Sequence, residues 1–263
     1  MSLHLDLDGA WPVESLPMPT LNLREWGPRL RYCTTAGRID TFSRQIGMEL
    51  PSFLLYGSGD FHHLSALWLR SLKEPFTLLS FDNHPDWDRR PPIWQCGAWI
   101  NRALELPNLV RAQIWTPTSP DVAGFGRLMA NRRALRSGRL QVFPHEGNWL
   151  KTFTEKVMRL RGESVYVTVD MDCLSPENAV TNWDQGKVSA KEIAEALALL
   201  HAETKVIGGD LCGAWSEPIF ERPLQRIASA IDHDRHILPP PETIRKNNME
   251  AFQIIWPALT PKY

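Results

Sequence analysis

The chain has 263 residues, enough for one large α/β domain or two small ones. Its formal net charge is -1 and its basic residues form no dense cluster, which argues against binding nucleic acid or a membrane surface. The four cysteines are scattered without a CxxC pair, so we expect reduced thiols rather than a zinc knuckle or a disulfide framework. A signal-peptide pattern is absent from the N-terminus, and no apolar run reaches the roughly 20 residues of a membrane span. We therefore predict a soluble, cytoplasmic protein.

Strand-like and helix-like segments alternate along the chain. The first half predicts, in order, a strand at 4–8, a Pro-rich surface segment to 19, a helix at 39–46, a strand at 53–56, a helix at 61–72, a strand at 76–81, a helix at 97–106 and a strand at 109–115. The second half predicts a helix at 125–136, a strand at 140–143, a helix at 148–161, a strand at 164–169, a helix at 189–202 opened by a capping box, a strand at 205–211, and helices at 224–232 and 241–256. This alternation predicts a three-layer α/β/α fold with a mainly parallel sheet, in a single domain over 1–263.

Two of the predicted strands end in alternating acidic residues. The five side chains concerned are Asp82, His84 and Asp86, after the strand at 76–81, and Asp170 and Asp172, after the strand at 164–169. Alternate residues of an extended chain point to the same side. Because ligands of open parallel sheets bind beyond the carboxyl ends of the strands, we expect the two groups to meet. Four carboxylates in one place need positive charge, which favours a pair of divalent cations.

Three motifs in this order resemble the ureohydrolase family of arginases, agmatinases and formiminoglutamases. They are the Gly-rich turn with two histidines at 57–63, the sequence Asp-Asn-His-Pro-Asp at 82–86, and the sequence Val-Asp-Met-Asp at 169–172 followed by Pro176. The resemblance extends over about residues 53 to 218. It implies an arginase-like α/β/α fold and two divalent metal ions, with manganese as the expected metal.

By position, the resemblance implies six metal ligands: Asp82, Asp170, His62, Asp86, His84 and Asp172. The first two would bridge the ions, the next two would complete the shell of one ion, and the last two that of the other. In the Gly-rich turn, a gap-free alignment favours His62 as the ligand, with His63 as the alternative.

Four residues are predicted to take part in catalysis: Asp86, His63, Cys96 and Glu217. Cys96, which precedes Gly97, stands where arginases and agmatinases have a His-Gly pair, and the equally weighted alternative is a small buried residue without a catalytic role. The family's guanidinium-binding carboxylate should lie three residues after Asp210, where this chain has Gly213. Glu217 replaces it only if the loop is two residues longer. These departures bear on guanidinium recognition and leave the predicted metal centre intact.

Three residues of the loop at 177–187 are predicted to bind substrate: Trp183, Asp184 and Gln185. Their polar groups would lie close to the metals. Trp183 would give the pocket an aromatic wall together with Trp87, Trp94 and Trp99, and the alternative for all four indoles is ordinary burial.

The leading hypothesis is a metal-dependent hydrolase in which metal-bound hydroxide attacks a C–N bond of a guanidino, amidine or related amide compound. One alternative is a deacetylase-type amide hydrolase of the same fold with a single zinc ion and a His-His pair. Another is a non-catalytic descendant that keeps the metals for stability. The expected partner is a small-molecule substrate, without nucleic acid or membrane, and family members commonly form homo-oligomers.

Overall fold

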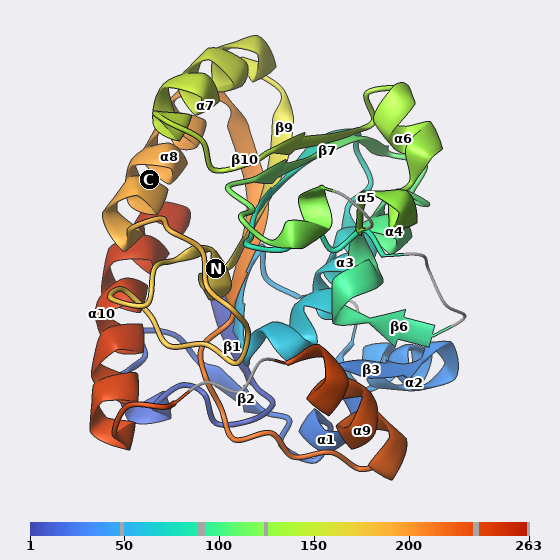
Figure 1. Ribbon diagram of the computed structural model, residues 1–263, viewed down its shortest axis with the longest axis vertical. Coiled ribbons are helices and arrows are strands. Elements are labelled where there is room, and N and C mark those ends of the chain that lie inside the picture. Colours follow the sequence, from blue (N-terminus) through green and yellow to red (C-terminus); the bar gives the residue numbers. More distant parts are fainter. Residues whose placement is uncertain (48–49, 89–92, 124–125, 234–236, 262–263) are drawn as a thin grey trace.

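The computed structural model describes residues 1–47, 50–88, 93–123, 126–233 and 237–261 (Figure 1). Within these ranges, eight strands form one sheet in which all neighbouring strands are parallel. Across the sheet, the strands are β2 (Thr20–Asn22), β1 (Ser2–Asp6), β4 (Phe53–Tyr56), β10 (Lys205–Cys212), β9 (Ser164–Asp170), β5 (Phe76–Phe81), β7 (Leu109–Trp115) and β8 (Leu140–Phe143). The seven predicted strands are confirmed, with ends that differ by at most two residues.

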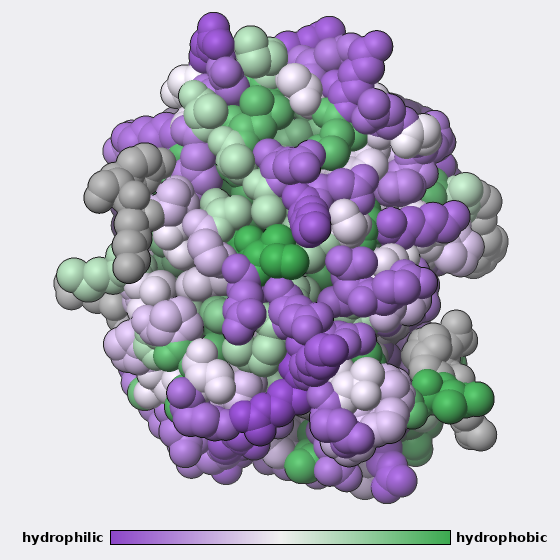
Figure 2. Space-filling model, turned by 90° about the vertical axis from the view of Figure 1, so that its left-hand side faces the viewer, coloured by the Kyte–Doolittle hydropathy of each residue, from purple (hydrophilic) through white to green (hydrophobic). Residues whose placement is uncertain are grey.

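Helices cover both faces of the sheet (Figure 1). One layer contains α7 (Trp149–Val157), α8 (Ala190–Glu203) and α10 (Pro241–Leu259), with α8 packed between the other two. Its outward side is largely hydrophilic (Figure 2). The other layer contains α2 (Ala36–Ile46), α3 (Ser65–Trp68), α4 (Trp99–Ala103), α5 (Gly126–Met129) and α6 (Arg132–Arg136). The predicted three-layer α/β/α architecture is therefore confirmed.

The central strand β5 shows why its sequence is mainly apolar and does not alternate. Phe76 and Leu78 belong to the hydrophobic cluster on one side of the sheet, and Leu79 and Phe81 belong to the cluster on the other side. All six residues of β5 are buried. A strand covered on both faces has no polar side, so the period-2 pattern of a half-exposed strand disappears.

Three predicted helices are corrected by the structure. The segment 61–72 is divided into the 3-10 turn η2 (Gly59–Leu64), α3 and the 3-10 turn η3 (Leu69–Ser71). The segment 97–106 begins as a 3-10 turn, η4 (Cys96–Ala98), and continues only as α4. The segment 125–136 contains α5 and α6 instead of one helix, and Phe125 lies outside the described residues. A 3-10 turn has three residues per turn and an α-helix has 3.6, so over a few residues both give a similar spacing of apolar side chains. The sequence pattern therefore predicted longer α-helices than the structure contains.

Several short elements in the first hundred residues were not predicted. They are α1 (Gly27–Leu30), β2 and an antiparallel pair of β3 (Cys33–Thr35) with β6 (Ile93–Gln95). Each has three or four residues, too few to show a period in the sequence. By contrast, the predicted capping box is confirmed, because the Ser189 hydroxyl accepts from the Glu192 amide and the Glu192 carboxylate accepts from the Ser189 amide. In the described ranges, no helix combines the length and apolar character that crossing a bilayer requires.

Candidate metal centre

The sheet register brings the two acidic segments together. Strands β5 and β9 are neighbours, and Phe81 pairs with Val169, so Asp82 and Asp170 follow at the same edge of the sheet. In the sheet, β10 separates β9 from β4. The end of β4 leads through the Gly-rich turn to η2. That turn places His62 over the same edge. Segments separated by about 100 residues therefore contribute to one site, as expected at the carboxyl ends of parallel strands.

His62 lies among three carboxylates. Its Nδ1 atom is 3.2 Å from Asp82 Oδ2, 3.3 Å from Asp86 Oδ2 and 3.3 Å from Asp170 Oδ2. The ring is 1% exposed, and all three carboxylates are buried. Separations of little more than 3 Å between this nitrogen and each carboxylate oxygen are those of neighbouring ligands around one divalent cation, for which bond lengths are about 2.0 to 2.3 Å.

His84 forms a second group beside the first. Its Nδ1 atom is 2.8 Å from Asp172 Oδ2 and 3.9 Å from Asp82 Oδ1. Asp82 therefore faces His62 with one carboxylate oxygen and His84 with the other. On its far side, the His84 ring meets Asp184, with 2.8 Å between Nε2 and Oδ1. The structure thus brings the six residues predicted as metal ligands to one edge of the sheet, with Asp82 between the two histidines and Asp170 facing His62.

The electrostatics of the two groups reflect crowded negative charge. Burial and the charge of Asp86 raise the pKa of Asp82 to about 7. Burial, together with Asp170 and Asp82, raises the pKa of Asp172 well above its ordinary value. For His62, burial opposes protonation, but the surrounding carboxylates outweigh it and raise the pKa well above the ordinary value. Divalent cations between these groups would relieve the same repulsion.

Two unpaired atoms test whether the residues fit a metal. His62 Nδ1 and Asp82 Oδ2 are buried and have no hydrogen-bond partner. Such atoms are costly unless something binds them. Both belong to the group of carboxylate and imidazole donors described above, which suits a divalent cation. The residues therefore fit the predicted metal centre.

Neighbouring side chains hold the His62 group in place. The Trp99 indole donates to Asp86 Oδ2 over 2.6 Å. Asp86 itself has a φ of +44°, a left-handed conformation that costs about 1 kcal/mol or more in a non-glycine residue. Behind the histidine, His62 Nε2 lies 2.9 Å from Thr168 Oγ1, which donates to Asp210 over 2.6 Å. Metal-binding histidines are commonly oriented in this way through their second nitrogen.

Four residues that support the centre were not predicted from the sequence: Asn83, Trp99, Thr168 and Asp210. Asn83 Nδ2 donates to the Asp184 carbonyl oxygen over 3.0 Å and so ties the first acidic motif to the loop at 177–187. Thr168 had a signal in the sequence, since it lies two residues before Asp170 on the same face of the strand. Trp99 and Asn83 bond to residues whose positions are set by loop conformation. The alternating pattern of residues in a strand cannot predict such contacts.

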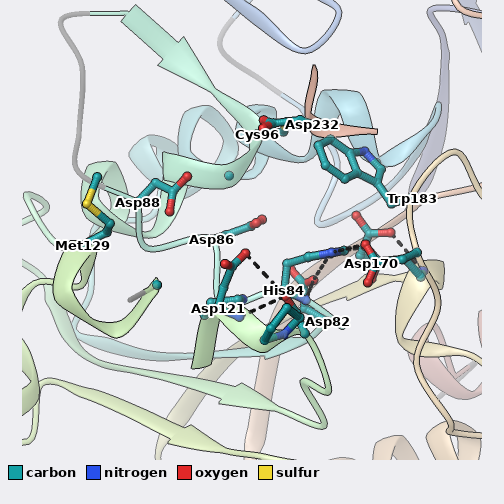
Figure 3. A pocket seen from close by; sticks show the side chains of 18 of the residues that line it. Asp82, His84, Asp86, Asp88, Cys96, Asp121, Met129, Asp170, Trp183 and Asp232 are labelled. Atoms are coloured by element: carbon teal, nitrogen blue, oxygen red, sulfur yellow. Dashed lines mark hydrogen bonds and ion pairs between the residues drawn. The ribbon is translucent and has the colours of Figure 1, made fainter. Parts of the chain in front are cut away.

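The candidate metal centre opens into a cavity of about 800 Å³ (Figure 3). Besides the predicted ligands, four aspartates line it, which we call the acidic rim: Asp88, Asp121, Asp184 and Asp232. Burial and the charges of Asp121 and Asp232 raise the pKa of Asp88 to about 6. Among the lining residues that the structure describes, none is Lys or Arg.

The remaining predicted site residues divide into two sets. Cys96, Trp183 and Asp184 line the cavity, whereas the structure does not bring His63, Gln185 and Glu217 into its lining. His63 is fully buried, and burial lowers its pKa to about 3. Gln185 Nε2 donates to the carbonyl oxygens of Leu174 and Ala179, at 3.2 and 3.0 Å. Glu217 is exposed.

Only one of the four tryptophans proposed as pocket walls lines the cavity. The Trp183 ring packs against His233 in a tilted arrangement, with ring centroids 4.0 Å apart, and lies edge-to-face with His84 at a centroid distance of 5.5 Å. Trp87, Trp94 and Trp99 are buried outside the lining, which matches the alternative of ordinary burial.

Sequence comparison finds distant relatives, and no protein-family model matches the chain. The chain is 29% identical over 168 residues to an uncharacterised protein of Thermotoga maritima, a match that covers 62% of this chain and 60% of that protein. It is 42% identical over 60 residues to an agmatinase of Halalkalibacterium halodurans, which covers 22% of this chain and 21% of the agmatinase. Both matches span less than two thirds of the relative's length.

Solved structures match over nearly the whole chain. The proclavaminate amidino hydrolase of Streptomyces clavuligerus superimposes with a TM-score of 0.60 at 14% identity, over 98% of this chain and 91% of that one. An arginase from Bacillus subtilis gives a TM-score of 0.58 at 12% identity, over 100% and 99% of the two chains. The protein therefore has an arginase-like α/β fold. The predicted resemblance to the ureohydrolases is confirmed at the level of the fold.

Proposed function

We propose that this protein is a hydrolase with two divalent metal ions that cleaves a C–N bond of a positively charged guanidino or amidine compound. The observation that carries the proposal is the pair of ligand groups sharing Asp82. One contains His62, Asp82 and Asp86, and the other contains Asp82, His84 and Asp172. The arginase-like fold of the solved structures supports the same class of hydrolase.

Bound at these two groups, a pair of divalent cations would lower the pKa of water and polarise the C–N carbon for attack. The chain's own residues would hold the ions and orient the substrate. Asp82 has one oxygen toward each histidine, which supports a bridging role for its carboxylate. Asp170 Oδ2 lies 3.3 Å from His62 Nδ1, and we propose that its carboxylate is the second bridge. Oxygen and imidazole donors alone, as around His84, favour manganese.

The charge of the cavity supports a cationic substrate. The acidic rim adds four carboxylates to those of the candidate metal centre, and the described lining has no basic side chain to offset them. Two divalent cations would balance four carboxylates at most, so the rim keeps a negative potential toward the open side. Guanidinium and amidinium groups carry a positive charge and match carboxylates through paired N–H donors, unlike a neutral amide.

Recognition of the reacting group differs from the expectation of a carboxylate at position 213. A Cβ atom on Gly213 would lie 2.2 Å from Asp170 Oδ1, so a side chain has no room there. Glu217, the other candidate, is exposed and outside the lining. We therefore assign recognition to the carboxylate of Asp184, which already faces His84, and to the rest of the acidic rim.

A substrate panel tests the proposal. The protein, loaded with Mn²⁺, is incubated with guanidino, amidino, formimino and acylamino compounds, and release of urea, ammonia or acid is measured. We expect turnover of one or more cationic guanidino or amidino compounds and about two metal ions per chain. Turnover of acylamino compounds alone, with about one zinc ion per chain, would favour the deacetylase-type alternative. A correctly metallated protein without activity on the panel would favour the non-catalytic alternative.

A further inference from the structure

A cysteine thiol lies beside the His62 group. Cys212 is the last residue of β10, and the sheet register pairs it with Asp170 at the end of β9. Its Sγ atom is 3.5 Å from Asp170 Oδ2, and the side chain is fully buried. His62 Nδ1, Asp170 Oδ2 and Cys212 Sγ all lie within 4.8 Å of one another. A sulfur atom therefore accompanies the nitrogen and oxygen donors on this side of the candidate metal centre.

The backbone after Cys212 brings this thiol close to Asp170. Gly213 has a φ of +103°, which only glycine adopts readily, and its amide donates to the Gly57 carbonyl oxygen over 3.0 Å. A Cβ atom at this residue would overlap Asp170 Oδ1 and the Met171 amide nitrogen. Glycine at position 213 thus allows the end of β10 to lie directly against the candidate bridging carboxylate.

A second observation points to a ligand at the same place. His62 Nδ1 is buried without a hydrogen-bond partner and lies 3.3 Å from Asp170 Oδ2. The separations of 3.3 and 3.5 Å from one carboxylate oxygen to the imidazole nitrogen and to the sulfur are those of neighbouring ligands on one ion, because metal–nitrogen and metal–sulfur bonds are about 2.0 and 2.3 Å long.

We propose that Cys212 is a sulfur ligand of the metal ion on the His62 side, which makes that position select a thiophilic ion such as Zn²⁺ while the His84 side keeps oxygen and nitrogen donors only. This inference rests on the proposed metal centre. On binding, the Cys212 S–H bond is broken, its proton is released to solvent, and the sulfur forms a bond to the ion, without change of oxidation state. Thiolates favour zinc and related ions, whereas oxygen-rich sites suit manganese.

Cobalt(II) substitution tests the sulfur bond directly. The metal-free, full-length protein is titrated with Co²⁺ and its absorption spectrum is recorded. We expect a thiolate-to-cobalt charge-transfer band in the near ultraviolet in addition to the weak visible bands of bound Co²⁺. Visible bands without the charge-transfer band would overturn this inference and leave the proposed metal centre standing. Absence of any bound cobalt would count against the metal centre itself, and with it against the inference.

Paired cysteine variants sharpen the assignment. Cys212→Ser removes the sulfur at nearly constant size, and Cys173→Ser is the matched control, since Cys173 is also free and fully buried but belongs to none of the candidate ligand groups in the described residues. We expect Cys212→Ser to lose the charge-transfer band and to weaken Zn²⁺ binding by roughly tenfold or more, with Mn²⁺ affinity little changed. Cys173→Ser should retain both properties. Equal zinc affinity in the two variants, with the band retained in Cys212→Ser, would show that Cys212 is only a buried neighbour of Asp170.

Discussion

The two sides of the candidate metal centre differ in how completely the protein encloses them. On the inner side, the His62 ring is 1% exposed, is backed by Trp99 at 4.7 Å between ring centroids, and is fixed through Thr168. On the outer side, the His84 side chain is 14% exposed and faces Asp184, whose side chain is 42% exposed. The inner position is therefore built before an ion binds, whereas the outer position is open to solvent and depends on a loop.

This difference suggests a division of tasks. A rigid, dry position retains its ion because every donor is already placed, and little entropy is lost on binding. An accessible position allows exchange of water and approach of a substrate. The following predictions test this comparison, from the largest expected effect to the smallest.

The strongest test removes a buried charge that is predicted to bridge the two ions. Asp170→Asn takes away a carboxylate that lies 3.3 Å from His62 Nδ1 and beside Cys212. We expect loss of at least one metal ion per chain and a fall in turnover of about a thousandfold or more, as for other essential ligands. Metal analysis and the substrate panel measure the result. Asp40→Asn, on the exposed surface of α2, is the control. Full metal content with full activity in Asp170→Asn would refute the ligand assignment.

Removing each histidine separately compares the two sides. His62→Ala leaves three buried carboxylates without their common partner, so we expect loss of the inner ion, weakened binding of the other, and a lower Tm after metal loading. His84→Ala should lose only the outer ion and retain about one per chain. Both changes should reduce turnover by about a hundredfold or more. The comparison fails if the two variants retain the same metals with the same affinities.

Supporting contacts should matter more on the inner side. Trp99→Phe keeps an aromatic ring but removes the indole hydrogen bond to Asp86. This hydrogen bond helps to hold Asp86 in its left-handed backbone conformation. We expect about a tenfold loss of metal affinity on the His62 side. Asp184→Asn, on the outer side, should affect metal affinity less and raise KM for a cationic substrate. Calorimetric metal titration and steady-state kinetics distinguish the two. If Asp184→Asn lost more metal affinity than Trp99→Phe, the outer position would depend more on its supporting contacts than the inner one, contrary to this prediction.

The smallest expected effect concerns pH. In the metal-free protein, the pKa of Asp82 is raised from 3.8 to about 7, so the folded chain retains a proton that the unfolded chain loses. Stability should therefore fall as pH rises from about 4 through 7. Burial lowers the pKa of His84, but Asp172 and Asp184 outweigh burial and raise this pKa well above 6.5. Stability is therefore lost further when His84 gives up its proton at higher pH. We expect Tm of the metal-free protein to be a few degrees lower at pH 7.5 than at pH 5.5. A divalent cation should remove or invert this trend, because protons then compete with the ion.

The strands and their acidic ends could be predicted from the sequence because both depend on the pattern of neighbouring residues. Apolar runs identified the buried strands, and alternation placed Asp82, His84 and Asp86 on one side of the chain. The 3-10 turn that carries His62 was assigned as a helix, yet its motif still identified the residue. Glu217 shows the opposite case, because its predicted role needed a loop path that the sequence did not specify, and the structure leaves it exposed.

The sequence by itself determined the α/β class, the strands, and the residue types able to hold divalent cations, since these depend on periodicity and on donor chemistry. Only the tertiary structure decided that β5, β9 and β10 are neighbours, that His62 rather than His63 faces the carboxylates, and that Cys212 touches Asp170. Contacts between segments about 100 residues apart are fixed by strand order and packing, which leave no local signal in the chain.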